Sequence, residues 1–378
     1  MISLSLDALT KSYRNKELIS KLAKHLRQEA SNGSYKFMHV CGTHEDTITK
    51  HGLRAILPSN IEIVAGPGCP VCVTHPEQIE LALKLLEEKK NGTLTTFGDM
   101  FRVPSRYGRS FSHAKAKGFE IKVVYSISDA IKIAKDHKDK EVVHFAIGFE
   151  TTAPSTAASL LQDPPKNFSI ISAHLTIPPV LDYLLASGEL AVQGLILPGH
   201  VSTIIGVKVY EFLVNRYNVP QVVAGFEPLD VLVALMSLLR QVNAGESRVE
   251  NEYGRVVKPE GNLKAKKMIN EVFRLADAKW RGLGTVPNSG LQLKPEFTQF
   301  DAGMKFDIEP PEIASDMEAG CRCSDIIKGL TKPEECLLFG RVCTPYDPRG
   351  PCMVGSEGTC AIAYKYGRFN SFFRNSRM

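Results

Sequence analysis

The sequence predicts an α/β fold with two similar parallel-sheet domains and a small, cysteine-rich iron–sulfur domain at the C-terminal end. Short apolar segments alternate with amphipathic ones as far as residue 245, polar residues follow the apolar segments, and six of the 9 cysteines lie between residues 321 and 360. Alternating strands and helices are typical of parallel sheets covered on both faces. A chain of 378 residues is long enough for two or three domains.

The apolar segments divide into two groups of four. We expect strands at 35–40, 61–65, 93–97, 121–125, 142–147, 168–173, 195–197 and 221–224, and helices at 17–29, 76–86, 128–134, 229–242 and 263–280. These groups predict α/β domain I at 1–140, α/β domain II at 141–245 and the iron–sulfur domain at 246–378, with a linker near 135–141. Eight strands could instead close one barrel, but the polar residues differ between the two halves, which favours two domains.

Composition excludes several classes of function. A net charge of +5 without basic blocks among aromatic residues does not indicate nucleic-acid binding. No apolar run approaches the ~20 residues that span a bilayer, and residues 1–7 lack a signal-peptide pattern, so we expect a cytoplasmic protein. In that compartment cysteines are used for metal or redox chemistry rather than structural disulfides. The phosphate-binding glycine motifs of ATP and NAD enzymes are missing.

The most constrained loop is Gly66-Pro67-Gly68-Cys69-Pro70-Val71-Cys72, between an expected strand and an expected helix. Its glycines and prolines restrict the backbone, so both thiols lie in one turn near a helix N-terminus, which favours the thiolate. Two cysteines separated by two residues form a redox disulfide or share a metal. We interpret Cys69 and Cys72 in this way; two buried structural cysteines are the simpler alternative.

A second candidate site is Cys41-Gly42-Thr43-His44-Glu45, at the end of the first expected strand. Cys41 can act as a nucleophile or soft-metal ligand, and His44 and Glu45 are available for proton transfer or orientation. A core cysteine beside a helix cap is the alternative. A functional role is favoured because Cys69 and Cys72 also follow a strand, and the carboxyl ends of parallel strands meet at one edge of a sheet.

Glu150 follows a strand in the segment Gly148–Pro154 and is a candidate catalytic residue. Helix capping explains the threonines beside it fully, so a site role and a purely structural role are equally favoured for Glu150. The remaining candidates at strand ends are single polar residues that a structural hydrogen bond would explain equally well: His75, Asp99, Thr151, His174, His200 and Glu227.

The C-terminal cysteines indicate a metal site. They are Cys321, Cys323, Cys336, Cys343, Cys352 and Cys360. Zinc is usually held by paired C-x-x-C knuckles, which are missing here, and the irregular, proline-interrupted spacing favours a 4Fe-4S cluster, with zinc as the alternative. We predict Cys323, Cys336, Cys343 and Cys360 as the ligands, which leaves Cys321 and Cys352 as a nearby redox pair.

Several long motifs, in order along the chain, resemble the HypD family of NiFe-hydrogenase maturation proteins. They are CGTHE at 41–45, GPGCPVC at 66–72, GFETTAP at 148–154, LFGRVCTP at 338–345 and GPCMVGSEGTC at 350–360. The resemblance covers nearly the whole chain. It implies a two-lobed α/β body with a 4Fe-4S domain.

The resemblance also implies partners and a substrate. The chain would bind a HypC-type small chaperone, on which the Fe(CN)2CO unit is assembled, and a HypE-type partner would supply cyanide from its carboxy-terminal thiocyanate. Cys41 would bind the Fe(II) that transiently carries cyanide and CO, sharing it with a thiolate of the chaperone. Cys69 and Cys72 would form the dithiol/disulfide, and the C-terminal cysteines would hold the cluster. The chain would then be a redox-active scaffold for metal-centre assembly.

Two other functions fit the residues. The first is an iron–sulfur-dependent thiol–disulfide oxidoreductase whose substrate is a protein disulfide. The second is a scaffold with a purely structural cluster, whose cysteines only hold and hand over a metal. The sequence leaves open whether the chain is a catalyst or an assembly platform.

Overall fold

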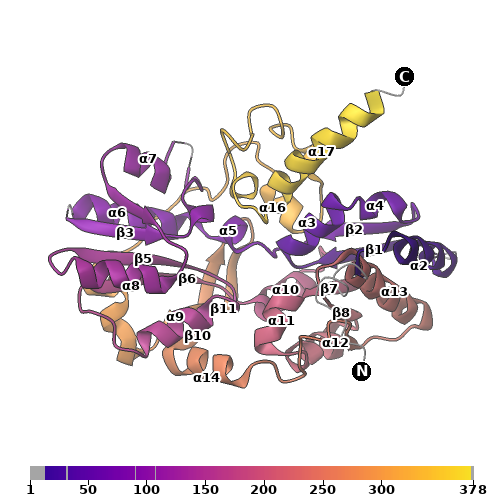
Figure 1. Ribbon diagram of the computed structural model, residues 1–378, viewed down its shortest axis with the longest axis horizontal. Coiled ribbons are helices and arrows are strands. Elements are labelled where there is room, and N and C mark those ends of the chain that lie inside the picture. Colours follow the sequence, from indigo (N-terminus) through magenta and orange to yellow (C-terminus); the bar gives the residue numbers. More distant parts are fainter. Residues whose placement is uncertain (1–12, 31–32, 90, 107, 376–378) are drawn as a thin grey trace.

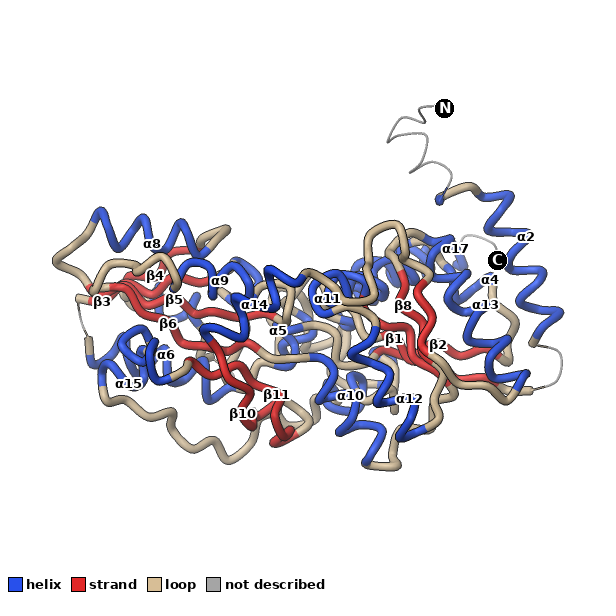
Figure 2. The backbone as a smooth tube through the Cα atoms, turned by 90° about the horizontal axis from the view of Figure 1, so that it is seen from below, coloured by secondary structure: helices blue, strands red, loops and turns tan. Residues whose placement is uncertain are grey.

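Two lobes, each built on an open parallel sheet, lie side by side in the computed structural model (Figure 1, Figure 2). The structure describes residues 13–30, 33–89, 91–106 and 108–375, with side chains as far as residue 367. Residues 1–7, on which the signal-peptide expectation rests, lie outside this range. Both parallel sheets and all eight expected strands are confirmed, and the single-barrel alternative is wrong because the strands form separate open sheets.

The first sheet has the strand order β2-β1-β7-β8-β9, and every neighbouring pair is parallel. Its strands are β1 (Tyr35–His39), β2 (Ile61–Ala65), β7 (Gly194–Pro198), β8 (Gln221–Ala224) and β9 (Val249–Asn251). The helices of this lobe are α2 (Lys16–Glu29), α3 (Gly42–Lys50), α4 (Leu53–Ile56), α11 (Gly199–Ile205), α12 (Glu211–Tyr217) and α13 (Pro228–Ala244), with η2 (Lys208–Tyr210) before α12. Helix α13 packs on β7 and β8 and against α2, which buries its apolar face.

The second sheet has the order β4-β3-β5-β6, again entirely parallel. Its strands are β3 (Gly92–Thr96), β4 (Glu120–Val123), β5 (Glu141–Gly148) and β6 (Phe168–His174). The helices connected to it are α6 (Pro76–Glu88), η1 (Gly98–Met100), α7 (Phe111–Ala116), α8 (Ile127–Asp136) and α9 (Ala153–Leu160). Helix α10 (Ile177–Ala186) then leads the chain back to the first sheet.

The predicted boundary at residue 140 does not separate the two sheets. Strands β3 and β4 precede it and share a sheet with β5 and β6, which follow it, while β1 and β2 share a sheet with β7 and β8. The expected linker is only the short loop between α8 and β5. Between β1 and β9 the chain thus crosses between the lobes twice. Sequence periodicity identifies strands but carries no information about which distant strands pair, because pairing is a long-range property.

The expected helix 263–280 ends early. Helix α14 (Leu263–Val272) is followed by β10 (Phe273–Trp280), which forms an antiparallel hairpin with β11 (Gly284–Leu293) between the two lobes (Figure 1). Trp280 is fully buried, and its indole N–H donates to Ser289 Oγ (2.8 Å). This cross-strand contact stabilises the strand conformation where local helical spacing alone suggested a continuous helix.

The C-terminal segment, from residue 321 onward, lies over the junction of the lobes (Figure 1). Its elements are α16 (Cys323–Ile327), η4 (Pro333–Glu335), η5 (Pro351–Met353) and α17 (Thr359–Asn375), while the preceding η3 (Pro295–Phe300) and α15 (Ala302–Phe306) pack against β6 in the second lobe. Helix α17 packs against α3, and η5 packs against α5 (Pro70–Val73). In the described part of the chain, no helix is both long and apolar enough to cross a membrane.

Candidate functional site

Cys41 lies where β1 passes into helix α3. It is the N-cap residue of this helix, with extended backbone angles. Strands β1 and β2 are in register from Tyr35 opposite Ile61 to His39 opposite Ala65, so both end at the same level. The loop after β1, with Cys41, and the loop after β2, with Cys69, therefore leave one sheet edge together, as the sequence predicts.

The two loops are in direct contact through glycine. The Gly42 N–H donates to the Gly68 carbonyl (3.2 Å), and the Gly66 N–H donates to the His39 carbonyl (2.8 Å). A Cβ atom added at Gly68 would collide with the backbone of Cys41. Glycine is required at this position because only a residue without a side chain permits so close an approach. The loop that carries Cys69 thus packs against the backbone of Cys41.

Cys69 and Cys72 form a disulfide, with Cα atoms 5.3 Å apart. Cys69 caps the one-turn helix α5, and its Sγ accepts a hydrogen bond from the Cys72 N–H (3.2 Å). Both residues are buried, with 6% and 1% of their surface exposed. Of the two alternatives that the spacing leaves open, the structure contains the disulfide.

The Cys41 thiol is buried beside a carboxylate that sequence reasoning missed. Burial and the nearby charge of Glu357 raise the pKa of Cys41 to about 12. Thr43 Oγ1 donates to Glu357 Oε1 (2.8 Å), and a Cβ atom at Gly42 would collide with Glu357. Glu357 belongs to the motif at 350–360, but no rule of spacing relates it to a residue more than 300 positions earlier. Its contact with the Cys41 loop joins the C-terminal segment to the first lobe.

His44 is buried and anchors the first lobe. Its Nε2 lies 2.9 Å from the Gly225 carbonyl and 3.3 Å from that of Ala224, as expected for a donated hydrogen bond. Burial, together with the neighbouring His39, lowers the pKa of His44 to about 3. The imidazole is therefore neutral near pH 7, and it connects α3 to the end of β8. This arrangement favours the orienting role over proton transfer.

Both carboxylate oxygens of Glu45 also accept hydrogen bonds. Its carboxylate accepts hydrogen bonds from His39 Nε2 (2.7 Å), Thr49 Oγ1 (2.6 Å) and both terminal nitrogens of Arg54 (2.7 and 2.9 Å). Burial opposes ionisation, but the charge and hydrogen bonds of Arg54 and the hydrogen bond from His39 outweigh it, so the pKa of Glu45 lies well below its usual value. The carboxylate holds α3 in place and is not a free base.

Glu150 lies in the second lobe and not beside Cys41. One carboxylate oxygen accepts a hydrogen bond from the Ile177 N–H (2.9 Å), and the other has no partner among the described residues. Burial raises the pKa of Glu150 to about 7. The residue lines a largely apolar cavity of about 610 Å³ formed mainly by α10, α12, α14, β10 and β11.

Most of the single polar residues at strand ends make contacts that a structural role explains. His174 is hydrogen-bonded to Thr156 Oγ1 (2.9 Å), as the structural alternative predicts. His200 stacks on Phe226, with ring centroids 3.8 Å apart, and Phe226 also stacks on His44. Asp99 accepts a hydrogen bond from Ser356 and Glu227 pairs with Arg14, while Thr151 makes no side-chain hydrogen bond among the described contacts.

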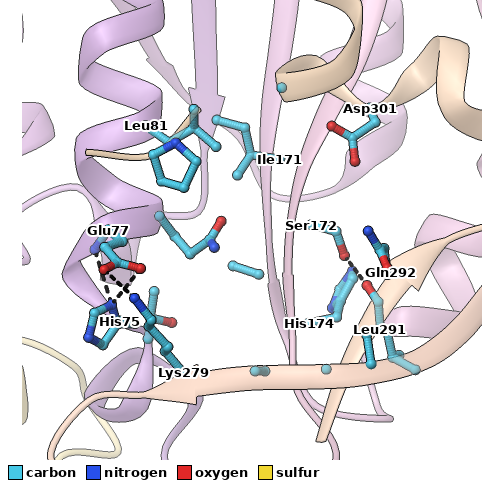
Figure 3. A pocket seen from close by; sticks show the side chains of 18 of the residues that line it. His75, Glu77, Leu81, Ile171, Ser172, His174, Lys279, Leu291, Gln292 and Asp301 are labelled. Atoms are coloured by element: carbon cyan, nitrogen blue, oxygen red, sulfur yellow. Dashed lines mark hydrogen bonds and ion pairs between the residues drawn. The ribbon is translucent and has the colours of Figure 1, made fainter. Parts of the chain in front are cut away.

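His75 lines a cavity at the start of helix α6. Figure 3 shows this cavity, about 530 Å³ in volume, with His75, Glu77 and Lys279 on one side and Ser172, His174, Gln292 and Asp301 on the other. Lys279 Nζ donates to Glu77 Oε1 (2.6 Å), and His75 Nδ1 lies 3.6 Å from Glu77 Oε2. His75 thus caps α6 and interacts with Glu77.

The six C-terminal cysteines gather around one small cavity. All of them line it, together with Ile326, Leu338, Phe339 and Met353. The thiols of Cys323 and Cys352 are hydrogen-bonded to each other, and Cys343 Sγ accepts from the Arg349 N–H (3.4 Å). In the described residues no three ligand-type side chains converge on a single metal-ion position. Four thiolates are enough for a 4Fe-4S cluster or for a structural zinc ion, and the six cysteines supply more than four sulfur donors.

The chain was compared with known protein families. The family model named HypD, described as "Hydrogenase formation hypA family", matches residues 17–367. A hydrogenase expression/formation protein of Methanocaldococcus jannaschii is 48% identical over 372 residues, covering 97% of this chain and all of the relative. The hydrogenase maturation factors HypD2 of Bradyrhizobium diazoefficiens and HypD of Escherichia coli are 45% and 41% identical, each covering 94% of this chain and 96% of its own.

Solved structures add nothing to this result. A D-threo-3-hydroxyaspartate dehydratase from Delftia sp. HT23 aligns with 78% of this chain and 86% of its own at 10% identity. Its TM-score of 0.16 is too low to indicate a shared fold.

Proposed function

Because the chain belongs to the HypD family of hydrogenase maturation factors, we propose that it is the scaffold and redox centre for assembly of the Fe(CN)2CO unit of the NiFe-hydrogenase active site. A HypC-type small chaperone would bring the iron, and a HypE-type partner would supply the cyanide. The contact between the loops of Cys41 and Cys69 is the observation that carries this proposal. It supports the proposal because it brings the loop of a free thiol, Cys41, against the loop of the Cys69–Cys72 disulfide.

Cys41 is the proposed ligand of the substrate iron. Fe(II) that carries cyanide and CO favours soft ligands, and a thiolate meets this requirement. With the pKa of its thiol raised to about 12, Cys41 is protonated near pH 7 until iron displaces the proton. Only 6% of Cys41 is exposed, so the chaperone's iron must approach through a narrow opening or a local rearrangement. A thiolate from the chaperone would be a second ligand of the iron.

Cys69 and Cys72 supply the electrons that release cyanide from a thiocyanate. Cleaving the S–C bond needs two electrons and gives one thiolate and one cyanide ion. Oxidation of the Cys69–Cys72 dithiol to the disulfide releases two electrons and two protons; one proton goes to the leaving thiolate and the other to solvent. The disulfide in the structure corresponds to the oxidised form of this pair, after it has given up its electrons. The backbone contact at Gly68 supports this role, because it holds the loop of Cys69 against the loop of Cys41.

The C-terminal cysteines are proposed to hold a 4Fe-4S cluster, with Cys323, Cys336, Cys343 and Cys360 as ligands. Such a cluster supplies one electron at a time when bound. The chain's own contribution is a small cavity in which apolar side chains surround the sulfurs. Cys321 and Cys352 lie at the same cavity and remain beside the proposed ligands.

The alternative of an oxidoreductase acting on protein disulfides is less well supported. Thiol–disulfide exchange requires an attacking thiolate to reach a sulfur of the pair. Cys69 and Cys72 are almost completely buried, and Val71 between them packs against Gly355 of the C-terminal segment. A large protein substrate has no access to them in this conformation.

The test is infrared spectroscopy of the chain purified anaerobically with the small chaperone. Cyanide and carbonyl bands are expected for the natural sequence and should disappear in Cys41→Ala. The visible absorbance of the cluster should persist in the variant, because Cys41 is not one of the cluster cysteines. Unchanged bands in Cys41→Ala would exclude Cys41 as the iron ligand.

A further inference from the structure

Arg281 is a charged side chain in the interior of the protein. It lies at the turn between β10 and β11, between the two lobes, and only 2% of its surface is exposed. Among the fully buried side chains only Trp280 is larger. A buried cation is costly unless it is paired with an anion, so its surroundings must contain the opposite charge.

The hydrogen bonds of Arg281 do not provide that charge. Its Nε donates to the Asp316 carbonyl (2.8 Å), and one terminal nitrogen donates to the Pro104 carbonyl (2.7 Å). Both acceptors are neutral backbone groups. The Asp316 carboxylate accepts instead from the Gly282 N–H (2.7 Å), and Arg281 forms no ion pair with any described Asp or Glu.

The segment that carries the C-terminal cysteines packs against the turn of Arg281. Gly282 packs against Ser324, since a Cβ atom added there would lie 3.0 Å from Ser324 Cα, and Ser324 Oγ donates to the Gly282 carbonyl (2.5 Å). This contact brings the turn to the segment that carries Cys323. Burial lowers the pKa of Arg281, and Cys323 and Cys321 oppose that effect more strongly than Asp316 does. Cys352 acts in the same direction.

The backbone of Arg281 also contacts the redox disulfide loop. Its N–H donates to the carbonyl of Val73 (2.8 Å), the residue that follows Cys72 and ends α5. The backbone of Arg281 therefore contacts the disulfide helix, and the turn that carries Arg281 contacts the segment of the C-terminal cysteines.

We propose that Arg281 is the countercharge of the C-terminal cysteine site, and that its guanidinium stabilises the negative charge which the thiolates and their bound cluster carry. This inference rests on the proposed function, because it requires the cysteines to hold an anionic group. Reduction adds one further negative charge to such a group. A fixed positive charge nearby in a region of low dielectric favours that addition. Arg281 is thus a positioning residue that makes the bound cluster easier to reduce.

The test measures the reduction potential of the cluster in the full-length, anaerobically purified chain. Arg281→Met removes the charge and Arg281→Lys keeps it. Arg274→Met is the matched control, because Arg274 lies on the same hairpin but is exposed and bonded to Gln292. Spectroelectrochemical titration gives the potential, iron and sulfide analysis gives the loading, and far-ultraviolet circular dichroism reports folding.

In Arg281→Met the ratio of reduced to oxidised cluster at a fixed potential should fall at least tenfold, which is 59 mV for a one-electron couple. Arg281→Lys should shift less, and Arg274→Met should match the natural sequence. Loss of the cluster from Arg281→Met but not from Arg281→Lys would also support the countercharge.

Three results would overturn the inference. The first is an unchanged potential in a loaded Arg281→Met. The second is loss of the cluster in both Arg281 variants, which would show that the hydrogen bonds to Pro104 and Asp316 matter and the charge does not. The third is failure of Arg281→Met to fold. If the natural sequence itself binds no iron and sulfide, the proposed cluster fails instead, and the two failures are distinguishable.

Discussion

Cys41, Cys69 and Cys72 lie on loops that leave neighbouring strands of a sheet, whereas the six C-terminal cysteines lie in a segment of short helices and turns. In the first region, the parallel register of β1 and β2 and the contact at Gly68 fix the thiols before anything binds. In the second region, there is no sheet to fix them. The comparison indicates that the backbone alone positions the sulfurs of Cys41, Cys69 and Cys72. In the C-terminal segment, by contrast, the bound group must help to position the backbone that carries the cysteines.

The largest expected effect is the loss of bound iron when a C-terminal cysteine is replaced. Cys360→Ser removes a proposed ligand from the first turn of α17, so most of the iron and the visible absorbance should be lost, while the far-ultraviolet circular dichroism of the two sheets stays nearly unchanged. Cys321→Ser is the control and should retain most of the iron. Equal iron loss in the two variants would show that the ligand set differs from the one proposed.

The sheet-borne region should be most sensitive at Gly68. Gly68→Ala places a Cβ atom against the backbone of Cys41, which cannot move aside easily, so unfolding should become easier by about 3 kcal/mol. Gly98→Ala is the control, because its Cβ atom would meet only Val123 at an ordinary 3.6 Å. Denaturant titration measures both. Similar stabilities for the two variants would contradict the close contact between the loops.

A smaller effect on stability is expected at the ion pair between Glu45 and Arg54. Glu45→Gln weakens the interaction with Arg54, whose side chain is 38% exposed, and should cost about 2 kcal/mol near pH 7. Because folding lowers the pKa of Glu45, its contribution is present above the pKa of the unfolded chain, about 4.3, and is lost as the pH falls through the folded value. The stability difference between the natural sequence and Glu45→Gln should therefore be constant from pH 8 to pH 6 and shrink below about pH 4.3. A difference independent of pH would exclude this role for the carboxylate.

The smallest effect concerns the contact between the two regions. Glu357→Gln removes the charge that helps to raise the pKa of Cys41, so alkylation of Cys41 at pH 8 should become several-fold faster. Mass spectrometry after iodoacetamide treatment identifies the site, and the exposed residue Glu312 provides the control variant Glu312→Gln. Slower alkylation in Glu357→Gln would mean that the carboxylate assists the thiol rather than suppressing its ionisation.

The same comparison explains what the sequence could predict. The eight strands and the meeting of Cys41 with the loop of Cys69 and Cys72 follow from local periodicity and from the common direction of parallel strands. The division of strands between the sheets and the end of α14 at Val272 depend on distant partners and could not be predicted. The same holds for Glu357 and Arg281, because each acts on cysteines that lie tens to hundreds of residues away in the sequence.

The iron site at Cys41 is tested most directly by Mössbauer spectroscopy of the chain loaded with 57Fe in the presence of the small chaperone. The natural sequence should give two signals, one from the cluster and one from low-spin Fe(II). Cys41→Ala should retain the cluster signal and lose the low-spin signal completely. A low-spin signal of undiminished intensity in Cys41→Ala would show that the iron binds elsewhere.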